Sequence, residues 1–283
     1  MKKQSKGGRA VLVICIILAL LILAPVAAVL FYGNAKLDKI QFTDGTREVE
    51  GVVDQENKTV IAQNKVMTSV KDSLPEIEIV EATVEVRVEE TVTNILMIIT
   101  DEESEQVSDD SHVKSISLIS KDKNGNTVKS VEIDGSIGVK VLEGSHAGEY
   151  DRLSNTYVYG GEALLKKQVQ EAFRVQVDQF VRINEVTLTN AIEEFSTASL
   201  GEINQLADKY LAQVRTDFSK GDVAQLLTQI PSIITSMGED TFSSMEIPLE
   251  GWTTGANDQL LYAMDFEQLA SQLQDYIYGE SEK

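Results

Sequence analysis

The chain has 283 residues, of which 42% are hydrophobic, and a formal net charge of -20. This length permits one large domain or two small ones, with enough residues for a hydrophobic core. The sequence pI is about 4.5, and no basic patch occurs after the first nine residues. Nucleic-acid binding depends on clustered positive charge, so the composition argues against that class of protein.

The N-terminal segment predicts a membrane anchor. Four basic residues in positions 2–9 precede an apolar run from Ala10 to Tyr32 that contains no charged side chain. A run of this length spans the ~30 Å hydrocarbon core as a helix, and it is longer than the core of a cleavable signal peptide. Because positive flanks stay in the cytoplasm, we expect a single-pass protein of the cell membrane. Residues 1–9 would be cytoplasmic and the C-terminal part extracellular, with cleavage near Ala27 as the alternative.

The predicted extracellular part is strongly acidic. Residues 1–32 contain no Asp or Glu and four of the 25 basic residues, so the remainder has 21 basic and 45 acidic residues, a formal charge of -24. Such a charge favours solubility. The single cysteine, Cys15, lies inside the apolar run. The extracellular part therefore has neither a disulfide nor a thiol nucleophile.

Residues 33–92 are predicted to form a β-rich juxtamembrane segment. Apolar and polar residues alternate in 80–92 (VEATVEVRVEETV) and again in 46–54 (TREVEGVVD). This alternation is typical of strands, and the charged alternates favour edge or hairpin positions.

Residues 93–283 are predicted to form an α/β domain. The apolar run 94–99 (NILMII) predicts a buried central strand. It ends in Thr100-Asp101, at the end of the strand where open α/β sheets bind ligands. Two further strands at 112–120 and 127–133 are predicted to form a hairpin around Asn124-Gly125, and 137–143 alternates again.

The stretch 151–173 (DRLSNTYVYGGEALLKKQVQEAF) is the most informative part of the domain. Tyr157 and Tyr159 precede Gly160-Gly161, after which apolar residues recur every four positions and predict a helix. A glycine pair at a helix start permits close approach of a ligand, and the N–H groups there favour an anion. The other interpretation is a sharp turn into a buried helix.

The C-terminal third is predicted from its capping residues. A strand at 177–184 and a helix at 185–195 come first. Ser199 with Glu202 and Asp265 with Gln268 have the spacing of capping boxes, which predicts a helix towards Phe218 and a last helix after 265. Asp222 is expected to start another helix, and 245–251 is expected to pair with 259–265. This order predicts a three-layer α/β/α domain with a mixed sheet.

Familiar catalytic motifs are missing from the sequence. There are two histidines, no G-x-S-x-G, no zinc-ligand spacing and no Walker or Rossmann glycine pattern. Asp101, Asp109 and Asp110 are candidates for a divalent-cation site, although an acidic loop is more often only solvated.

The order of these segments resembles the LytR-CpsA-Psr family, the cell envelope-related transcriptional attenuators of Gram-positive bacteria. The resemblance covers the anchor, NILMIITDEES, the hairpin 112–133, the stretch 151–173, VQVDQFVRINEVTLTNAIEEF and the tail around IPLEG. It implies an envelope protein of the class that transfers glycopolymers from a polyprenyl pyrophosphate carrier to peptidoglycan. The implied partners are the membrane through Ala10–Tyr32, a polyprenyl-linked glycopolymer and peptidoglycan.

The family site holds pyrophosphate with an arginine cluster and with Mg²⁺ bound by two aspartates. Asp101 stands at the first aspartate, but Lys114 stands at the second, and Asp134-Gly135 replaces an expected arginine-aspartate pair. His112 stands at another arginine, and the later arginine-bearing segment has no counterpart. Each lost charge-assisted hydrogen bond costs about 1.5–3 kcal/mol. The ligand-binding residues that the resemblance implies are Asp101, Arg152, Tyr157, Tyr159, Gly160 and Gly161, with Asp101 as the metal ligand.

We interpret the sequence as a family-like protein whose catalytic site has degenerated. Lys114 would pair with Asp101 and take the metal's charge position, and an apolar cavity lined by Tyr157–Leu165 would still bind a lipid or polymer. The first alternative is an active phosphotransferase with Mg²⁺ on Asp101, in which Arg152, Arg174 and Arg182 rebuild a phosphate site. The second is a structural surface module.

Overall fold

The computed structural model describes residues 41–44, 71, 73–101, 113–122, 127–197, 202, 205–206, 209–210, 212–219 and 242–279. Several predictions lie outside these residues: the membrane anchor at 10–32, the strand at 46–54, the Asn124-Gly125 turn and the helix that begins at Asp222. Asp109, Asp110 and His112 lie outside them as well. In the part that is described, no helix is long and apolar enough to cross a membrane.

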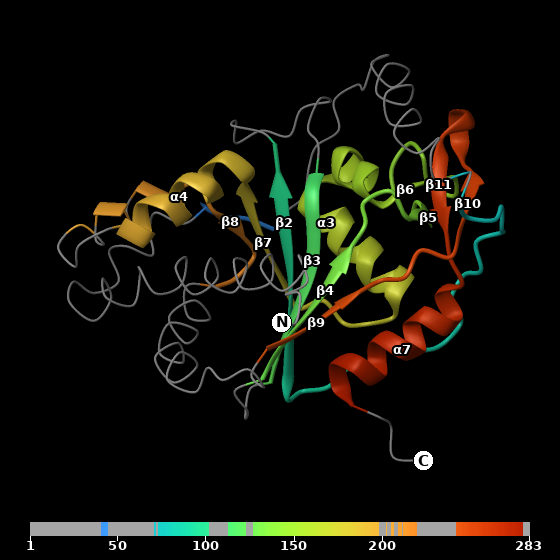
Figure 1. Ribbon diagram of the computed structural model, residues 1–283, viewed down its shortest axis with the longest axis horizontal. Helices are drawn as coiled ribbons and strands as arrows, with labels where there is room; N and C mark the ends of the chain where they lie inside the picture. The colour runs from blue at the N-terminus through green and yellow to red at the C-terminus, as the bar shows by residue number, and fades with distance from the viewer. Residues whose placement is uncertain are drawn as a thin grey trace, which may run out of the picture.

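A seven-stranded mixed sheet forms the centre of the domain, in the order β1-β8-β7-β2-β3-β4-β9 (Figure 1). β2 pairs antiparallel with β3 and parallel with β7. The α/β class and the mixed sheet are therefore confirmed. The strands of this sheet are β1 (Gln41–Phe42), β2 (Val92–Thr100), β3 (Val113–Asp122), β4 (Val128–Ile133), β7 (Gln179–Asn184), β8 (Arg215–Thr216) and β9 (Phe242–Glu246).

The predicted central strand and its hairpin partners are confirmed. The apolar run 94–99 lies within β2, which is buried along most of its length. β3 and β4 form the antiparallel pair expected from 112–133. Side chains on successive positions of β2 enter two different cores, since a strand alternates its faces: Leu96 and Ile98 enter one core, and Met97 enters the other.

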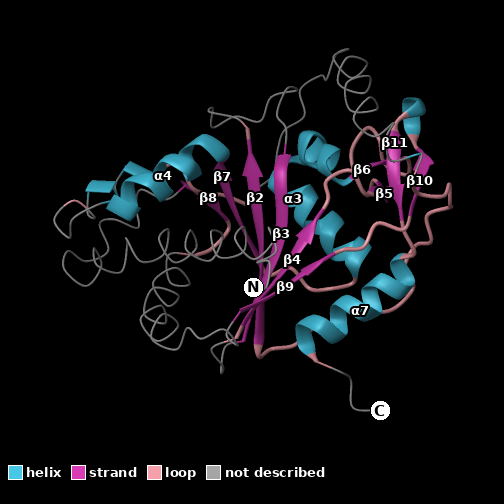
Figure 2. Cartoon of the chain, in the orientation of Figure 1, coloured by secondary structure: helices cyan, strands magenta, loops and turns pink. Residues whose placement is uncertain are grey.

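Helices cover both faces of the sheet (Figure 2). α3 (Leu153–Phe173) and α7 (Phe266–Tyr278) contribute side chains to the larger core, on the face of Leu96. α4 (Glu185–Thr197) contributes Leu188 to the smaller core on the other face. Because the strands carry apolar side chains on both faces of the sheet, both faces must be buried, and helices on either side bury them.

The strands predicted in 80–92 are not formed. Between turns at 73 and at 90–91, this segment makes only single β-bridges, from Glu76 to Trp252, from Val80 to Asp265 and from Arg87 to Val175. The segment crosses one element after another and runs along none of them, so each pairing lasts one residue. Alternating polarity was correct for an extended backbone, but it does not specify a partner strand.

Two predictions for the C-terminal third are also wrong. The helix expected to reach Phe218 is replaced near its end by β8, where burial alternates from Val214 to Phe218 as in a strand. The strand expected at 245–251 is divided: its first residues belong to β9, which pairs with β4, and β10 (Gly251–Thr254) pairs with β11 (Leu260–Ala263). Pro248 lies between the two strands, where a residue without an N–H interrupts a ladder.

A second small sheet lies beside the β10–β11 hairpin. β5 (Gly138–Lys140) pairs antiparallel with β6 (Tyr150–Arg152). A single bridge from Ile137 to Tyr262 connects it to β11. The predicted alternation at 137–143 is thus confirmed for its first half. β6, the partner strand, leads directly into α3.

The predicted N-cap residue of α7, Asp265, is confirmed, and it yields a test of the fold. The second bond of a capping box goes elsewhere, since the Asp265 N–H donates to the Glu250 carboxylate at 3.0 Å. The Asp265 carboxylate accepts a hydrogen bond from the Gln268 backbone N–H at 3.1 Å. Asp265→Ala is expected to lower the free energy of unfolding by about 1 kcal/mol, because one helix N–H loses its acceptor. Urea denaturation measures the change. Asp265→Asn keeps an acceptor and is the matched control, so equal losses in the two variants would contradict the cap.

Candidate functional site

Asp101 directly follows β2, and its carboxylate lies 3.5 Å from the Lys114 ammonium. The ladder between β2 and β3 passes from Ile99–Ser115 to Thr100–Val113, so Lys114 is the extra residue of a β-bulge. A bulge turns a side chain out of the regular alternation. The predicted ion pair between Lys114 and Asp101 is therefore confirmed, and a local irregularity of β3 supports it.

The described residues at this end of β2 do not fit a magnesium ion. Mg²⁺ takes oxygen ligands in octahedral geometry, whereas the neighbour of Asp101 is an ammonium group. Over the described ranges, no group of three His, Cys, Asp or Glu side chains could hold a metal ion. Lys114 supplies one positive charge and N–H donors beside Asp101, but an ammonium group cannot hold a carboxylate and several phosphate oxygens in one coordination sphere as a metal ion does.

Arg152 is the last residue of β6 and is held inside the protein. Its side chain is 3% exposed, and its Nε and Nη2 donate to the Leu260 carbonyl at 3.2 and 3.0 Å. Burial lowers the pKa of Arg152, while the charges of Asp151 and Asp134 act in the opposite direction. Asp134 stands where the family resemblance implies an arginine. The negative charge of Asp134 therefore partly compensates the positive charge of Arg152, at the position where a second positive charge was expected.

The helix after Arg152 begins at Leu153, seven residues before the predicted start at Gly160. Its first two N–H groups are already bonded: Leu153 donates to the Ile137 carbonyl at 2.8 Å and Ser154 donates to the Gly135 carbonyl at 2.9 Å. Orphan N–H groups make a helix start attractive to anions. Here the loop before β5 supplies the acceptors for these two groups.

Gly160 and Gly161 form a kink inside α3. Gly161 has φ 67° and ψ -158°, a conformation that is essentially restricted to glycine. A Cβ on Gly160 would lie 2.5 Å from the Cβ of Leu164. Gly161 is thus required by its backbone conformation and Gly160 by the contact with Leu164. This agrees with the interpretation of a sharp turn, but the turn bends a helix that has already begun.

The two tyrosines before the kink make internal contacts. Tyr157 is fully buried in the larger core together with Leu165. The Tyr159 hydroxyl donates to Asp151, and its ring stacks on His146 with centroids 4.4 Å apart. The cavity that is seen among the described residues has other walls, so a cavity lined by Tyr157–Leu165 stays a prediction.

The three arginines of the phosphotransferase alternative have different neighbours. Arg152 contacts Leu260. Arg174 ends α3 in a left-handed conformation, and its Nη2 donates to the Ala82 carbonyl at 2.7 Å. Arg182 is buried in β7. These contacts do not bring the three side chains together around one anion.

The structure instead places one of these arginines beside residues that the sequence did not single out. Arg182 on β7 lies in register with Arg215 on β8. The Arg215 Nη1 is 3.6 Å from the carboxylate of Glu162, which is only 2% exposed. One helical turn later, Lys166 pairs with Asp217 at 2.7 Å. A layer of paired charges therefore connects α3 to β8. The alternating pattern of 214–218 was the signal that would have placed Arg215 on a strand.

Arg152 offers a test of whether this region supports the fold or binds a ligand. Arg152→Gln is expected to lower the free energy of unfolding by about 1.5–3 kcal/mol, the value of hydrogen bonds to a charged group. Chemical denaturation measures the loss. Arg87→Gln is the control, since Arg87 also donates to a carbonyl, that of Gly279 at 2.9 Å, but is partly exposed and should lose less. Unchanged stability of Arg152→Gln would contradict the structural role.

Comparisons with known proteins support the fold. No protein-family model matches the sequence, and no curated protein matches it. The structure of the transcriptional regulator yvhJ from Bacillus subtilis matches with a TM-score of 0.51 and 13% identity, over 68% of this chain and 100% of that one. Protein gbs0355 from Streptococcus agalactiae matches with a TM-score of 0.53 and 13% identity, over 68% of this chain and 90% of that one. The chain therefore has the fold of the LytR-CpsA-Psr proteins, with a sequence that has diverged strongly from theirs.

Proposed function

We propose that this chain is a cell-envelope protein that binds a polyprenyl-linked glycopolymer in cell-wall assembly, or regulates its transfer, without transferring it. In this proposal residues 10–32 anchor it in the membrane and the acidic domain is extracellular. The observation that carries the proposal is the Asp101–Lys114 ion pair at 3.5 Å. It stands at the position where the family resemblance implies a magnesium ion between two aspartates.

An ammonium group does not replace the metal in the chemistry of transfer. A divalent cation binds several phosphate oxygens and stabilises the charge that develops during displacement. Lys114 adds a single charge, part of which Asp101 already neutralises. The loss of metal contacts and of arginine hydrogen bonds removes the electrostatic stabilisation on which phosphoryl-type transfer depends. Binding through the apolar chain of a lipid has no such requirement.

A second candidate function is the active transferase, and the pair of arginines favours it. Arg182 and Arg215 face each other on adjacent strands, where opposite residues have Cα atoms about 4.5–5.5 Å apart. Guanidinium groups are suited to bidentate phosphate binding. Glu162 lies against Arg215 on the same side, so an anionic substrate would meet a carboxylate there as well.

Replacing Lys114 by aspartate restores the second carboxylate that the family resemblance implies, and it tests the role given to the Asp101–Lys114 ion pair. Lys114→Asp is expected to create saturable Mg²⁺ or Mn²⁺ binding, because two carboxylates would then face each other at the end of β2. Isothermal titration calorimetry of the purified chain measures it, and no such binding is expected for the unmodified protein. Lys167→Asp is the control, since Lys167 is also an exposed lysine in an ion pair, with Glu143 at 2.8 Å. Metal binding by the unmodified chain that is lost in Asp101→Asn would contradict the proposal.

Lipid binding separates the two candidate functions. The full chain in detergent is titrated with a long-chain polyprenyl pyrophosphate, with and without magnesium. We expect saturable binding that changes neither on removal of magnesium nor in Asp101→Asn. Binding that requires both magnesium and Asp101 would favour the transferase, and absence of binding would favour a structural surface module.

A further inference from the structure

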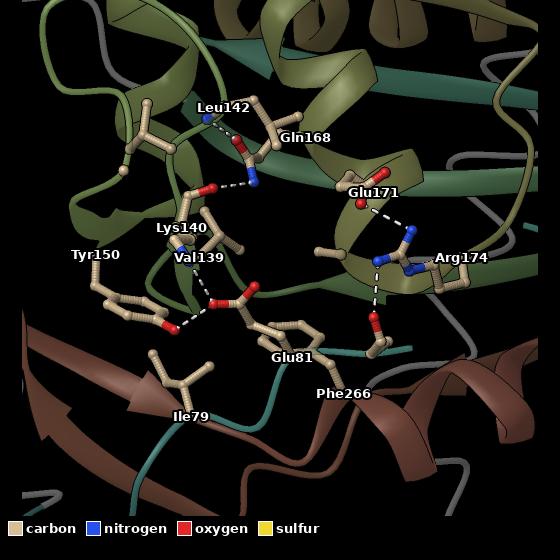
Figure 3. Close-up of a pocket in the computed structure, with 14 residues that line it drawn as sticks. Ile79, Glu81, Val139, Lys140, Leu142, Tyr150, Gln168, Glu171, Arg174 and Phe266 are labelled. Atoms are coloured by element: carbon tan, nitrogen blue, oxygen red, sulfur yellow. Dashed lines mark hydrogen bonds and ion pairs between the residues drawn. The ribbon is translucent and has the colours of Figure 1, made fainter. Parts of the chain in front are cut away.

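A pocket of about 310 Å³ lies between residues 79–82, the end of β5 and the second half of α3 (Figure 3). None of the six ligand-binding residues implied by the family resemblance lines it. Its volume is at the lower end of the range of small-molecule sites, about 300–1,000 Å³. The pocket therefore suits a ligand that is smaller than a lipid-linked polymer.

One side of the pocket presents a carboxylate with unused capacity. Glu81 Oε1 accepts hydrogen bonds from the Tyr150 hydroxyl at 2.7 Å and from the Lys140 ammonium at 3.1 Å. Both bonds reach the same oxygen, and Oε2 accepts none from the described residues. These two contacts lower the pKa of Glu81, while burial and the bond to Glu81 raise the pKa of Tyr150 to about 12. Glu81 is therefore ionised at neutral pH and can accept a further donor.

Another side of the pocket presents the guanidinium of Arg174. Arg174 Nη1 lies 2.8 Å from Glu171, and Nη2 donates to the Ala82 carbonyl at 2.7 Å. The Arg174 side chain is 21% exposed, and each of its two Nη atoms carries a second N–H besides the one in these contacts. Its Nε is buried and is out of a ligand's reach. A ligand carboxylate would therefore be bound through the Nη groups.

Apolar side chains separate the two polar groups. Figure 3 shows Glu81 and the Glu171–Arg174 pair on two sides of the pocket, with Val139, Ile79 and Phe266 at its walls. Val139 and Phe266 are buried in the larger core, so this part of the wall is fixed. The pocket thus has an acceptor, a donor and an apolar surface between them.

The charges of the pocket select among ligand classes. Two carboxylates, Glu81 and Glu171, and two cations, Lys140 and Arg174, line it, so the four charges sum to zero. A monoanion or a monocation would meet as much repulsion as attraction. An uncharged apolar molecule would displace water from Glu81 Oε2 and from the Arg174 Nη groups and offer them no hydrogen bond. A neutral molecule with separated positive and negative ends matches both.

We propose that this pocket binds a short zwitterionic peptide with small apolar side chains. Its ammonium end lies at Glu81, its carboxylate end lies at Arg174, and its side chains contact Val139, Ile79 and Phe266. Both ends make charge-assisted hydrogen bonds, which are stronger than neutral ones. This inference goes beyond the proposed function, because it needs neither magnesium nor a polyprenyl lipid.

The test is calorimetric titration of the full chain in detergent with alanyl-leucine. We expect saturable binding, and binding at least about tenfold weaker, 1.4 kcal/mol, for N-acetyl-alanyl-leucine, for alanyl-leucinamide and for free leucine. Glu81→Gln should abolish the discrimination against the N-acetyl derivative, and Arg174→Lys should reduce the discrimination against the amide. Glu143→Gln removes the acidic partner of an exposed ion pair outside the pocket and should leave all affinities unchanged.

Three results would overturn the proposal: no saturable binding of alanyl-leucine at millimolar concentrations, equal binding of the blocked derivatives or of leucine, or discrimination that persists in Glu81→Gln. Glu81 is about half exposed, so this variant should fold, and its thermal unfolding checks that it does. Polyprenyl binding measured on the same preparation fails or succeeds independently, which separates this inference from the proposed function.

Discussion

β2 carries apolar side chains on both of its faces, so neither face can be left to water. Burying a Leu, Ile or Met side chain stabilises a fold by about 1.5–3 kcal/mol, and β2 contributes Leu96 and Ile98 to one core and Met97 to the other. This requirement places α3 and α7 on one face of the sheet and α4 on the opposite face. It also brings β2, β3 and β7 together, so that Asp101, Lys114 and Asn184 lie at or beside the same edge of the sheet.

At that edge and along α3, charged side chains are satisfied by the protein itself. Lys114 pairs with Asp101, Arg152 bonds the Leu260 carbonyl, and Arg215 lies against Glu162. A buried charge must have a partner, whichever partner it is. In a site that binds pyrophosphate, the ligand itself is the partner of some of the charged side chains. Here other residues of the protein already pair with many of them. This supports a protein that keeps the fold while binding something other than a metal–pyrophosphate complex.

Features that depend on neighbours in the sequence were predictable. The apolar run of β2, the β3–β4 hairpin and the Asp265 cap each follow from a few adjacent residues. The charge of Lys114 opposite Asp101 also followed, although only from the family resemblance. The β-bulge that directs Lys114 was not predictable, because it depends on the register between two strands.

Features that depend on distant partners were predicted incorrectly or missed. Alternation in 80–92 indicated an extended chain but not the elements that it crosses. Gly160-Gly161 indicated an unusual backbone but not a kink in a helix that had started at Leu153. The pocket beside Glu81 and Arg174 depends on residues from 79 to 266, and nothing in the local sequence around either residue marks it.

The segment 73–91 connects these observations. Thr83 and Val84 donate to the Glu267 carboxylate in the first turn of α7, and the Gln274 side chain donates to the Glu85 carbonyl. The same segment forms one wall of the pocket, and apart from three single bridges it has no strand ladder to hold it. A ligand that contacts both Glu81 and Arg174 binds only when the segment is packed against the domain. Ligand binding and packing of the segment are therefore linked. The free energy by which the ligand stabilises the packed form equals the free energy by which packing improves ligand binding. In the sequence the segment lies between β1 and β2, which both belong to the central sheet, and occupancy of the pocket would therefore be coupled to how firmly the domain holds the chain between these two strands.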